Sequence, residues 1–310
     1  MGVFMNRLVA ACSLALLSIP SFAFAQSCVG TPAAVQILGS GGPAINLFRS
    51  STSYLLWVDS QAKILVDMGG GSFHRFGQVQ AKLSDLAMVA VSHLHPDHVS
   101  DLPALLWLSH RSRKDPLPIV GPSGNDKFPN FPTFLSRLFD EKNGAFQVLG
   151  STIGSPPGEH GGGVRLDVGV VDVTKVEPSA VFDQQGIRVT AFGIPHGDFP
   201  DNVPNLAYRV QTRDRSIVFS SDQNGTNPGF VQFAKGANVL IMHLALPAGG
   251  KHPFHAAPEV IGRIAQEAGV GRLIVSHIGP FSLDPAIAGL KNFFTGPLTV
   301  GADLQCTQVE

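Results

Sequence analysis

Three histidines and an aspartate crowd into one six-residue stretch of the sequence. The segment Ser92-His93-Leu94-His95-Pro96-Asp97-His98 directly follows the apolar run Leu86–Val91. A continuous apolar run of this length is typical of a strand that is buried on both faces. A solvated polar loop rarely collects these side chains directly beyond a buried strand. The segment therefore predicts a metal site at the end of that strand.

The spacing inside the segment predicts which side chains share an ion. In extended backbone His93 and His95 point to the same side, so both imidazoles can bind one ion. Asp97 and His98 lie past the strand end, where a turn lets them face a second ion. Imidazole and carboxylate suit zinc, iron or manganese. We therefore expect two divalent cations, with Zn²⁺ as the first choice and Mn²⁺ or Fe²⁺ as alternatives.

One segment cannot complete two coordination spheres, so further ligands must come from elsewhere in the chain. Three candidates share one context, a position just past a predicted strand: His196, Asp222 and His277. The strands are expected over Ile187–Phe192, Ile217–Ser220 and Leu273–Val275. Strand ends that face a common cleft are where α/β proteins place their ligands. Each residue alone could be a hydrogen-bonded core residue, but together they bring the donors to the seven that a dinuclear site requires.

Short apolar runs and amphipathic stretches alternate in two successive sets along the chain, which predicts an α/β architecture. Helices are expected over Asp101–Leu108, Phe131–Leu138 and Pro258–Ala268. Between Glu141 and Val171 the periodicity fades among many Gly and Pro residues, so we expect a mobile surface insertion there. No linker separates independent domains, and residues 26–310 are expected to form a single one.

The first 25 residues have the composition of a secretory signal peptide. A basic residue precedes the apolar run Leu8–Ile19, and Ala23-Phe24-Ala25 gives the cleavage pattern ahead of Gln26. Pro20 breaks the run before it reaches the roughly 20 residues that a membrane span requires. We therefore expect a periplasmic or secreted protein that has no stable membrane anchor.

Cysteine content and charge narrow the possible environments and partners. The mature chain keeps Cys28 and Cys306, which either pair in an oxidising compartment or stay unpaired near the two ends. The formal net charge is −1, whereas a surface built for long nucleic acids requires a basic stripe. We expect no nucleic-acid partner, and we allow for a homodimer.

The chain resembles the metallo-β-lactamase-fold hydrolases in the order of its motifs. These motifs are Leu65-Val66-Asp67-Met68-Gly69, the HxHxDH segment and the three later ligand candidates. Within that family the chain resembles the RNase Z and arylsulfatase-like branch. The resemblance implies a four-layer αββα sandwich with the metals at one edge of the paired sheets. It assigns the first ion to His93, His95 and His196, the second to Asp97, His98 and His277, and makes Asp222 the bridge. It also places Asp67 behind the metal loop as a support.

The same resemblance assigns a catalytic role outside the ligand set. His255 sits where RNase Z-like enzymes keep a histidine that is not a ligand, and the stretch Ile264–His277 looks much like the corresponding region. We therefore interpret His255 as a proton donor and count Asp97 with it as catalytic. His252 is the rival for the donor role, and a surface histidine that caps the following helix is the alternative for either residue.

The chain departs from the family pattern at two points, and these restrict the function that the resemblance implies. Only 26 positions separate His196 from Asp222, which leaves no room for the tRNA-gripping arm that RNase Z inserts there. His243 occupies a place where relatives often have an acidic residue. The first departure argues against tRNA processing, and the second concerns the details of the pocket.

The expected activity is hydrolysis by a metal-bound hydroxide. Two ions about 3.5–4 Å apart lower the pKa of a shared water and neutralise charge that builds on the attacked group. This chemistry suits a small phosphodiester or a related sulfate ester, which is our first hypothesis for the substrate. The alternatives are a lactone or β-lactam hydrolase on the same fold, which the presence of Asp222 disfavours because typical β-lactamases lack a bridging aspartate, and a catalytically silent metal-binding protein.

Overall fold

The computed structural model describes residues 28–108, 113, 115–153, 164–198 and 202–310. The expected signal peptide and its cleavage point before Gln26 lie outside the described residues. Among the helices that the structure does describe, none is both long and apolar enough to cross a membrane.

The strands form two seven-stranded sheets. The first has the order β14-β1-β2-β3-β4-β5-β6 and the second the order β13-β12-β11-β10-β9-β8-β7. The strands of the first sheet are β1 (Ala33–Gly39), β2 (Ser53–Val58), β3 (Gln61–Val66), β4 (Met88–Ala90), β5 (Leu117–Pro122), β6 (Leu166–Val171) and β14 (Cys306–Gln308). Those of the second are β7 (Ser179–Gln184), β8 (Ile187–Gly193), β9 (Leu206–Thr212), β10 (Arg215–Phe219), β11 (Val239–His243), β12 (Arg272–Ser276) and β13 (Leu298–Val300).

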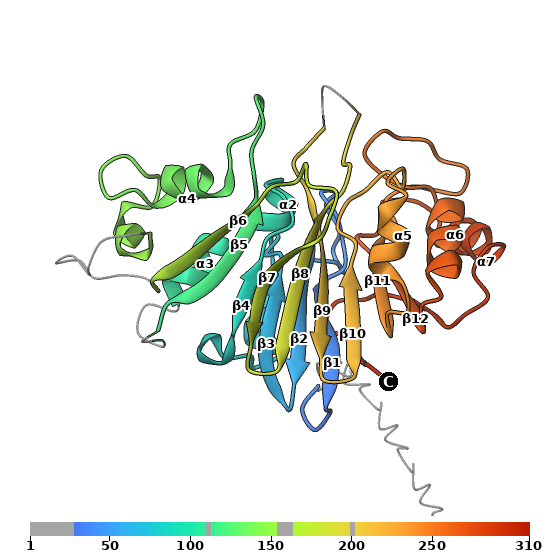
Figure 1. The fold of residues 1–310 in the computed structure, drawn as a ribbon, viewed down its shortest axis with the longest axis horizontal. Helices are drawn as coiled ribbons and strands as arrows, with labels where there is room; N and C mark the ends of the chain where they lie inside the picture. The colour runs from blue at the N-terminus through green and yellow to red at the C-terminus, as the bar shows by residue number, and fades with distance from the viewer. Residues whose placement is uncertain (1–27, 109–112, 114, 154–163, 199–201) are drawn as a thin grey trace, which may run out of the picture.

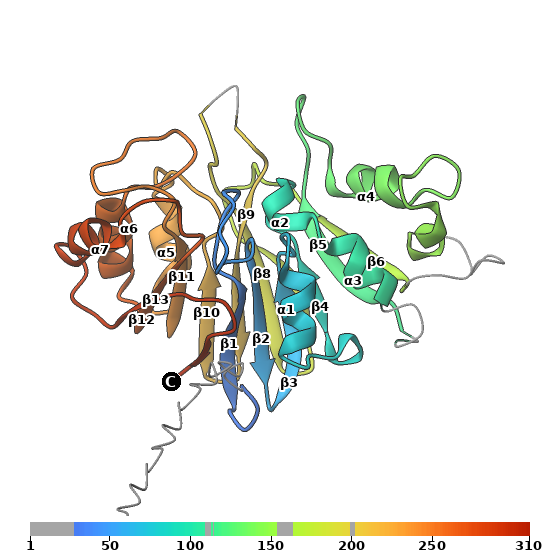
Figure 2. The ribbon, with the colours of Figure 1, turned by 180° about the vertical axis from the view of Figure 1, so that it is seen from behind.

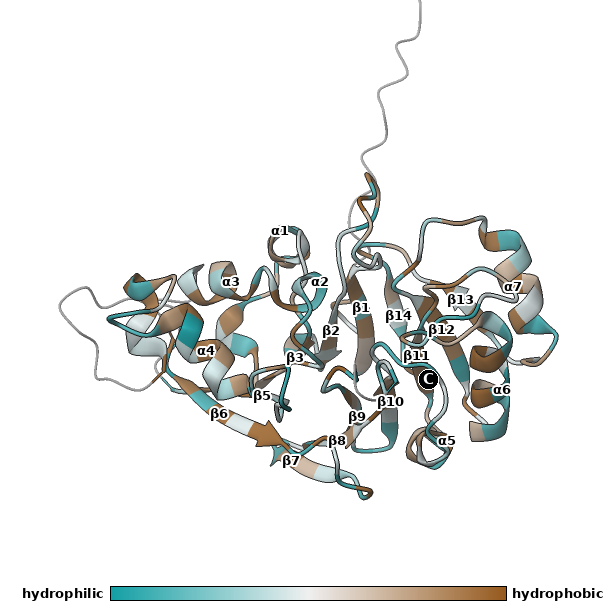
Figure 3. Ribbon diagram, turned by 90° about the horizontal axis from the view of Figure 1, so that it is seen from above, coloured by the Kyte–Doolittle hydropathy of each residue, from teal (hydrophilic) through white to brown (hydrophobic). Residues whose placement is uncertain are grey.

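Helices cover the outer faces of both sheets. The helices that accompany the first sheet are α1 (Ser72–Gln78), α2 (Pro96–Val99), α3 (Leu102–Leu108) and α4 (Phe131–Phe139), with the 3₁₀ turns η1 (Leu83–Asp85) and η3 (Gln147–Thr152). The second sheet carries α5 (Gly229–Ala234), α6 (Pro258–Ala268) and α7 (Leu283–Lys291). In the view from above, β1–β3 and β8–β10 lie in the centre, with α3 and α4 on one side and α6 and α7 on the other (Figure 3). The expected four-layer αββα sandwich is confirmed (Figure 1).

Three apolar cores hold these layers together. The central core lies between the two sheets and includes Tyr54 and Ile64 of the first sheet and Tyr208 and Val210 of the second, all fully buried. A second core packs the first sheet against α1, α3 and α4, and a third packs the second sheet against α5, α6 and α7. Since alternate residues of a strand face opposite sides, strands buried on both faces read as continuous apolar runs in the sequence.

Local sequence signals explain several element boundaries. Asp59 and Ser60 adopt left-handed backbone at the turn between β2 and β3, with φ of 48° and 65°. Asn130 caps α4, where its Oδ1 accepts the backbone N–H of Thr133 at 2.9 Å. Gly269 ends α6 in left-handed backbone (φ 60°), the conformation that favours glycine after a helix.

The sequence predicted a mobile surface insertion between Glu141 and Val171. This prediction is wrong for both described parts of the stretch. The 3₁₀ turn η3 occupies 147–152, and β6 occupies 166–171 and pairs in parallel with β5 over six residues. Five of the six residues of β6 are only partly buried or exposed, because it lies at the edge of its sheet. The glycine-rich centre of this stretch, 154–163, lies outside the described residues.

The two cysteines form a disulfide, which resolves the alternatives left open by the sequence. Cys28 and Cys306 are joined across a sequence separation of 278 residues. The bond attaches β14 to the segment that leads into β1, and β14 then pairs with β1 in antiparallel orientation. Both ends of the described chain are therefore anchored to the same edge of the first sheet (Figure 2).

Candidate metal centre

The HxHxDH segment leaves the first sheet at the end of β4 and turns into α2. His95 precedes the helix in extended backbone, Pro96 begins it, and the N–H of His98 donates to the carbonyl of His95 at 2.9 Å. Proline suits this first helical position because it has no N–H to satisfy. The turn points the extended residues and the helical residues to different parts of one site, as the sequence predicted.

The remaining candidates come from strand ends at one edge of the second sheet. Strands β10, β11 and β12 are parallel, and β8 runs in the same direction because two antiparallel pairings connect it to β10 through β9. Their carboxyl ends therefore meet at one edge. His196, Asp222 and His277 all lie just past these ends, and each is at most 2% exposed.

Four side chains converge in a group that could hold a first ion. His93 Nε2 lies 3.0 Å from His95 Nδ1, and His196 Nε2 lies 3.4 Å from the same atom. Asp222 Oδ2 is 3.7 Å from the His93 nitrogen and 3.6 Å from that of His196. Two nitrogens that bind one tetrahedral zinc at 2.0–2.1 Å lie about 3.3–3.4 Å apart, so this donor set has the size that zinc requires.

A second set surrounds the other side of the same carboxylate. His277 Nε2 lies 3.2 Å from Asp97 Oδ2 and 3.3 Å from Asp222 Oδ1. His98 Nε2 lies 3.5 Å from Asp222 Oδ2 and 3.7 Å from Asp97 Oδ2. This nitrogen of His98 is buried and makes no hydrogen bond. An orphaned buried nitrogen that faces two carboxylates fits a metal ligand.

His243 is a rival for Asp97 in the second set. Together with His98, Asp222 and His277 it forms a group whose ligand atoms lie within 4.8 Å of one another, and Asp97 is not in that group. Both ring nitrogens of His243 already have partners, however. Nδ1 donates to Asp222 Oδ1 at 2.6 Å, and Nε2 accepts from the Tyr54 hydroxyl at 2.9 Å. Since Asp97 Oδ2 has no comparable competitor and faces both histidines, we assign Asp97 as the ligand and His243 as a support of Asp222.

Hydrogen bonds behind the donors fix their ring orientations. Asp67 accepts from His98 Nδ1 at 2.8 Å, and also from the backbone N–H and hydroxyl of Ser92, each at 2.7 Å. His196 Nδ1 donates to the carbonyl of Phe254 at 2.9 Å. In both histidines the second nitrogen, Nε2, is then directed at the cluster, which is the usual arrangement around a bound metal.

The protonation of the donors agrees with metal binding. Burial lowers the pKa of His93 well below its ordinary value and that of His196 to about 4, so both rings are neutral at pH 7. Burial opposes ionisation of Asp222, yet His277, His243 and His98 hold its pKa well below the usual range. In His98 burial is outweighed by Asp67, which raises the pKa, so this ring must release a proton when a metal binds.

The two candidate proton donors separate clearly. His255 has a side chain that is 17% exposed, and its Nδ1 lies 3.8 Å from Asp222 Oδ1. That nitrogen makes no hydrogen bond. His252 is exposed, and its Nδ1 accepts the backbone N–H of Phe254 at 3.3 Å. The structure thus brings His255 to the cluster and leaves His252 outside it.

The sequence interpretation missed the residues that hold Asp222. Besides His243 and Tyr54, the amide of Asn205 donates to the backbone carbonyl of Asp222, and Asn205 Oδ1 accepts from the Ser221 hydroxyl at 3.0 Å. His243 gave a signal, since a histidine at the end of an apolar strand is unusual. Tyr54 and Asn205 gave none, because a buried polar residue in a strand reads as ordinary core.

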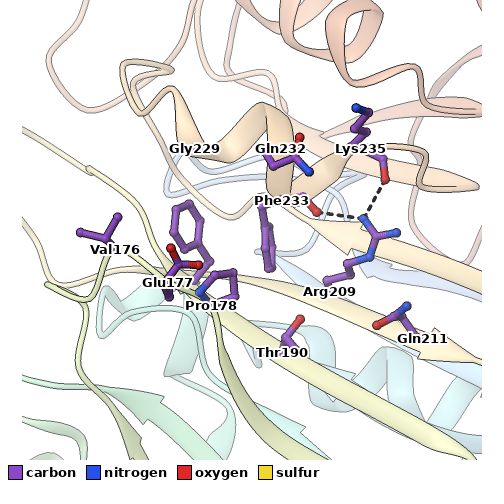
Figure 4. Close-up of a pocket in the computed structure, with 11 residues that line it drawn as sticks. Val176, Glu177, Pro178, Thr190, Arg209, Gln211, Gly229, Gln232, Phe233 and Lys235 are labelled. Carbon is purple, nitrogen blue, oxygen red and sulfur yellow. Dashed lines mark hydrogen bonds between the residues drawn. The ribbon is translucent and has the colours of Figure 1, made fainter.

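A separate pocket of about 670 Å³ opens on the outer face of the second sheet (Figure 4). Thr190 and Phe192 of β8, Arg209 of β9 and Phe233 of α5 line it. One guanidinium nitrogen of Arg209 donates to the backbone carbonyls of Phe233 and Lys235, at 2.8 and 3.0 Å. None of the seven proposed ligands lines this pocket, so it is not part of the metal centre.

Comparison with known proteins agrees with this arrangement. A model described as the metallo-β-lactamase superfamily matches residues 47–107, and one described as a β-lactamase superfamily domain matches 155–278. A ribonuclease Z from Mycobacterium avium (strain 104) is 27% identical over 300 residues, which cover 89% of this chain and 98% of the relative.

Solved structures show the same fold. The short form of human tRNase Z matches with a TM-score of 0.68 at 19% identity, over 89% of this chain and 99% of that one. A diphosphatase from the PhnP family matches with a TM-score of 0.62 at 15% identity, over 90% and 98%. The chain belongs to the metallo-β-lactamase superfamily. It is a metal-dependent hydrolase of that superfamily, and it is similar to the ribonucleases Z.

The shared carboxylate predicts how metal content responds to substitution. Asp222→Ala removes a donor from both sets, so we expect it to lower metal content at both positions. His93→Ala removes one nitrogen from the first set and should leave about one equivalent bound. Elemental analysis of purified protein after exposure to Zn²⁺ measures both, and wild-type protein should hold two equivalents per chain. Wild-type protein that never exceeds one equivalent would rule out the dinuclear assignment.

Proposed function

We propose that this chain is an exported dinuclear hydrolase that cleaves a small phosphodiester or a related sulfate ester. The observation that carries the proposal is the position of His255. It is a histidine outside the ligand set, partly exposed, and 3.8 Å from the carboxylate that both donor sets share. A group so placed can give a proton to a leaving oxygen at the cleft. Similarity to a ribonuclease Z and to a diphosphatase of the PhnP family supports phosphoester chemistry.

The residues of this site would divide the work. His93, His95, His196 and Asp222 would hold one cation, and Asp97, His98, His277 and Asp222 the other. When bound, two such cations lower the pKa of a water and neutralise charge on the attacked group. Asp67 orients His98, and Phe254 orients His196. Asp97 would complete the second set, where its Oδ2 lies 3.2 Å from His277 Nε2.

His255 would supply the proton to the leaving group. Burial lowers the pKa of His255 to about 4, so its ring is neutral at pH 7 in the free protein. An anionic ester beside the ring opposes this lowering, because a negative charge favours the protonated imidazole. The donor role is therefore compatible with an anionic substrate.

A small ester is favoured over tRNA by the connection between His196 and Asp222. Most of residues 202–222 belong to β9 and β10, which pair with each other across a turn at Arg213. No extended arm of the ribonuclease Z kind fits in these 26 positions. The net charge of −1 also offers little attraction to a polyanion.

A substrate panel tests the proposed activity. Bis(p-nitrophenyl) phosphate represents phosphodiesters, p-nitrophenyl sulfate represents sulfate esters, and a γ-lactone represents the main alternative. With Zn²⁺ present we expect turnover of the phosphodiester or the sulfate to exceed that of the lactone, because two cations match the charge on those groups. Preferred lactone turnover would favour the second hypothesis, and no turnover of any ester at full metal content would favour a silent binding protein.

Substitution of His255 tests its role as proton donor. General acid catalysis contributes about 10²- to 10⁴-fold, so His255→Ala should lower kcat by that range for an ester with a poor leaving group. The loss should shrink for p-nitrophenyl esters, whose leaving group scarcely needs a proton. Metal content should stay at the wild-type value. His252→Ala is the matched control and should change little, and metal loss in His255→Ala would instead identify a ligand.

We also propose that the mature protein is exported. The Cys28–Cys306 disulfide supports this, because such bonds persist in oxidising compartments. The apolar run and the cleavage pattern before Gln26 support it from the sequence. The protein from its native host should be found in the periplasmic or extracellular fraction. N-terminal sequencing of this protein should give a first residue at or near Gln26. Soluble cytoplasmic protein that retains Met1 would contradict export.

A further inference from the structure

His277 lacks the hydrogen bond that fixes the rings of two other proposed ligands. Nδ1 of His98 is bonded to Asp67, and Nδ1 of His196 is bonded to the carbonyl of Phe254. Among the residues that the structure describes, Nδ1 of His277 has no hydrogen-bond partner, although it is buried. The direction of this ring must therefore come from packing and from the position of its backbone.

Two groups pack closely against the His277 ring. The ring of His243 stacks on it, with centroids 4.7 Å apart and an interplanar angle of 13°. The backbone of Gly42 also lies against it, since a Cβ on Gly42 would come within 2.5–2.9 Å of three ring atoms. Hydrogen bonds to Tyr54 and Asp222 already hold His243. The position of Gly42, in contrast, depends on the segment that carries it.

The segment 40–42, which follows β1, holds the backbone of His277 as well as its ring. The carbonyl of Ser40 accepts the N–H of Ile278 at 2.9 Å, directly after His277. Gly41 forms an isolated β-bridge with the same residue. A shift of this segment would therefore move the strand end and the ring together.

Asp303 is the anchor of this segment. Its Oδ1 accepts the backbone N–H of Ser40 at 2.9 Å and the Ser40 hydroxyl at 2.7 Å. Its Oδ2 accepts the N–H of Ser50 at 2.7 Å and Nε of Arg75 at 3.2 Å. An ionised carboxylate has about four acceptor sites, so the capacity of Asp303 is fully used. The side chain is only 5% exposed, and water competes little for these bonds.

The segment that carries Asp303 crosses from the second sheet to the first near the C-terminus (Figure 2). On one side of Asp303, the N–H of Gly301 donates to the carbonyl of Val275 in β12 at 2.8 Å. On the other side, the N–H of Leu304 donates to the carbonyl of Ile37 in β1 at 2.7 Å. Asp303 therefore lies between the strand that leads to His277 and the strand that leads to Ser40.

The disulfide secures this crossing. Cys306 begins β14, which has only three residues, and it is joined to Cys28. Terminal segments fray unless they are attached to the rest of the fold. The bond keeps β14 paired with β1 and so keeps Asp303 within reach of Ser40.

We propose that Asp303 is a positioning residue, which holds the ring of His277 through the segment 40–42. The Cys28–Cys306 disulfide contributes to the same function, because it keeps the crossing segment in place. The cation at the position of His277 then depends on contacts with the C-terminal segment, whereas the cation at the position of His93 does not. This rests on the dinuclear centre of the proposed function, because His277 acts there as a ligand.

Substitution of Asp303 with asparagine tests this role. An amide in place of the carboxylate keeps the size of the side chain but directs N–H groups at other donors. The cation at the position of His277 should bind at least 10-fold more weakly, since changes behind a metal ligand commonly cost about 10- to 100-fold in metal affinity. The other cation should bind as in wild type. Calorimetric titration of the metal-free protein with Zn²⁺ measures both affinities.

Asp140→Asn is the matched control. Asp140 likewise accepts two backbone N–H groups, those of Lys142 and Asn143 at 3.0 and 2.8 Å, but it lies beyond α4. This variant should change neither zinc affinity. Weaker binding in Asp140→Asn equal to that in Asp303→Asn would overturn the positioning role.

A double variant separates positioning from a general structural role. His277→Ala should keep one cation, which is the one at the position of His93. If Asp303 acts through His277, the variant Asp303→Asn/His277→Ala should bind that cation as tightly as His277→Ala alone, because the two losses are then not additive. Weaker binding in the double variant would show that Asp303 supports the whole fold, and this would overturn the proposal.

Hydrogen exchange in the metal-free protein gives a measurement that needs no metal. Asp303→Asn and Cys28→Ser/Cys306→Ser should each speed exchange in a peptide that contains Ile278, followed by mass spectrometry. In Asp303→Asn a peptide from β10 should exchange as in wild type. Faster exchange of both peptides in that variant would indicate general destabilisation and would contradict the proposal.

These measurements also separate the proposal from the proposed function. If wild-type protein never held two equivalents of Zn²⁺ but Asp303→Asn still sped exchange at Ile278 alone, the dinuclear centre would fail and the positioning role would stand. If wild-type protein held two equivalents while Asp303→Asn changed neither zinc affinity nor exchange at Ile278, the positioning role would be overturned.

Discussion

The carboxylate of Asp222 is the group on which the arrangement of the centre depends. It is 2% exposed, and a buried charge without partners carries a large free-energy cost. Imidazole nitrogens surround it, from His93, His98, His196, His243, His255 and His277, at 2.6–3.8 Å. No local stretch of chain can supply so many donors. The strand ends of the second sheet and the metal loop of the first must therefore meet at this point.

Contacts between the sheets fix that meeting. The N–H of Leu206 in β9 donates to the carbonyl of Ser92 at 3.0 Å, and the Tyr208 hydroxyl donates to the carbonyl of Val91 at 2.8 Å. Both acceptors directly precede His93. These contacts connect the second sheet directly to the start of the HxHxDH segment. The packing of the sandwich therefore sets the position of that segment. Left-handed backbone at Asp67, Ser221 and His277 (φ 52–58°) then turns each strand end sharply toward the cluster. Such backbone costs energy in residues other than glycine and collects at functional sites.

Much of this centre could be predicted from the sequence, and the reasons are physical. The strand that precedes the HxHxDH segment is buried on both faces, so its apolar run and the polar residues after it were unmistakable. His196, Asp222 and His277 followed from the same pattern at other strand ends.

Edge strands were harder to predict from the sequence. β6 and β7 are only partly buried, and their weak apolar pattern resembles a loop. The helices α1 and α5 have only seven and six residues, which is too short for a repeated amphipathic period to show in the sequence. Supporting contacts such as that of Tyr54 depend on tertiary packing, which spacing along the chain does not contain.

His243 shows why a histidine can replace an acidic residue beside this centre. Burial lowers its pKa to about 3, although its hydrogen bond with Asp222 opposes this, so the ring is neutral and carries a single N–H. The Tyr54 hydroxyl donates to Nε2 at 2.9 Å, which leaves the proton on Nδ1, where it is donated to Asp222 Oδ1 at 2.6 Å. An acidic side chain at 243 would face Asp222 as a second negative charge, whereas the neutral ring adds a donor and no charge. With Oδ1 held in this way, Oδ2 points toward His93, His98 and His196, each within 3.5–3.7 Å. The orientation of the shared carboxylate is therefore set from the apolar interior of the sandwich, through a tyrosine of the first sheet and a histidine of the second.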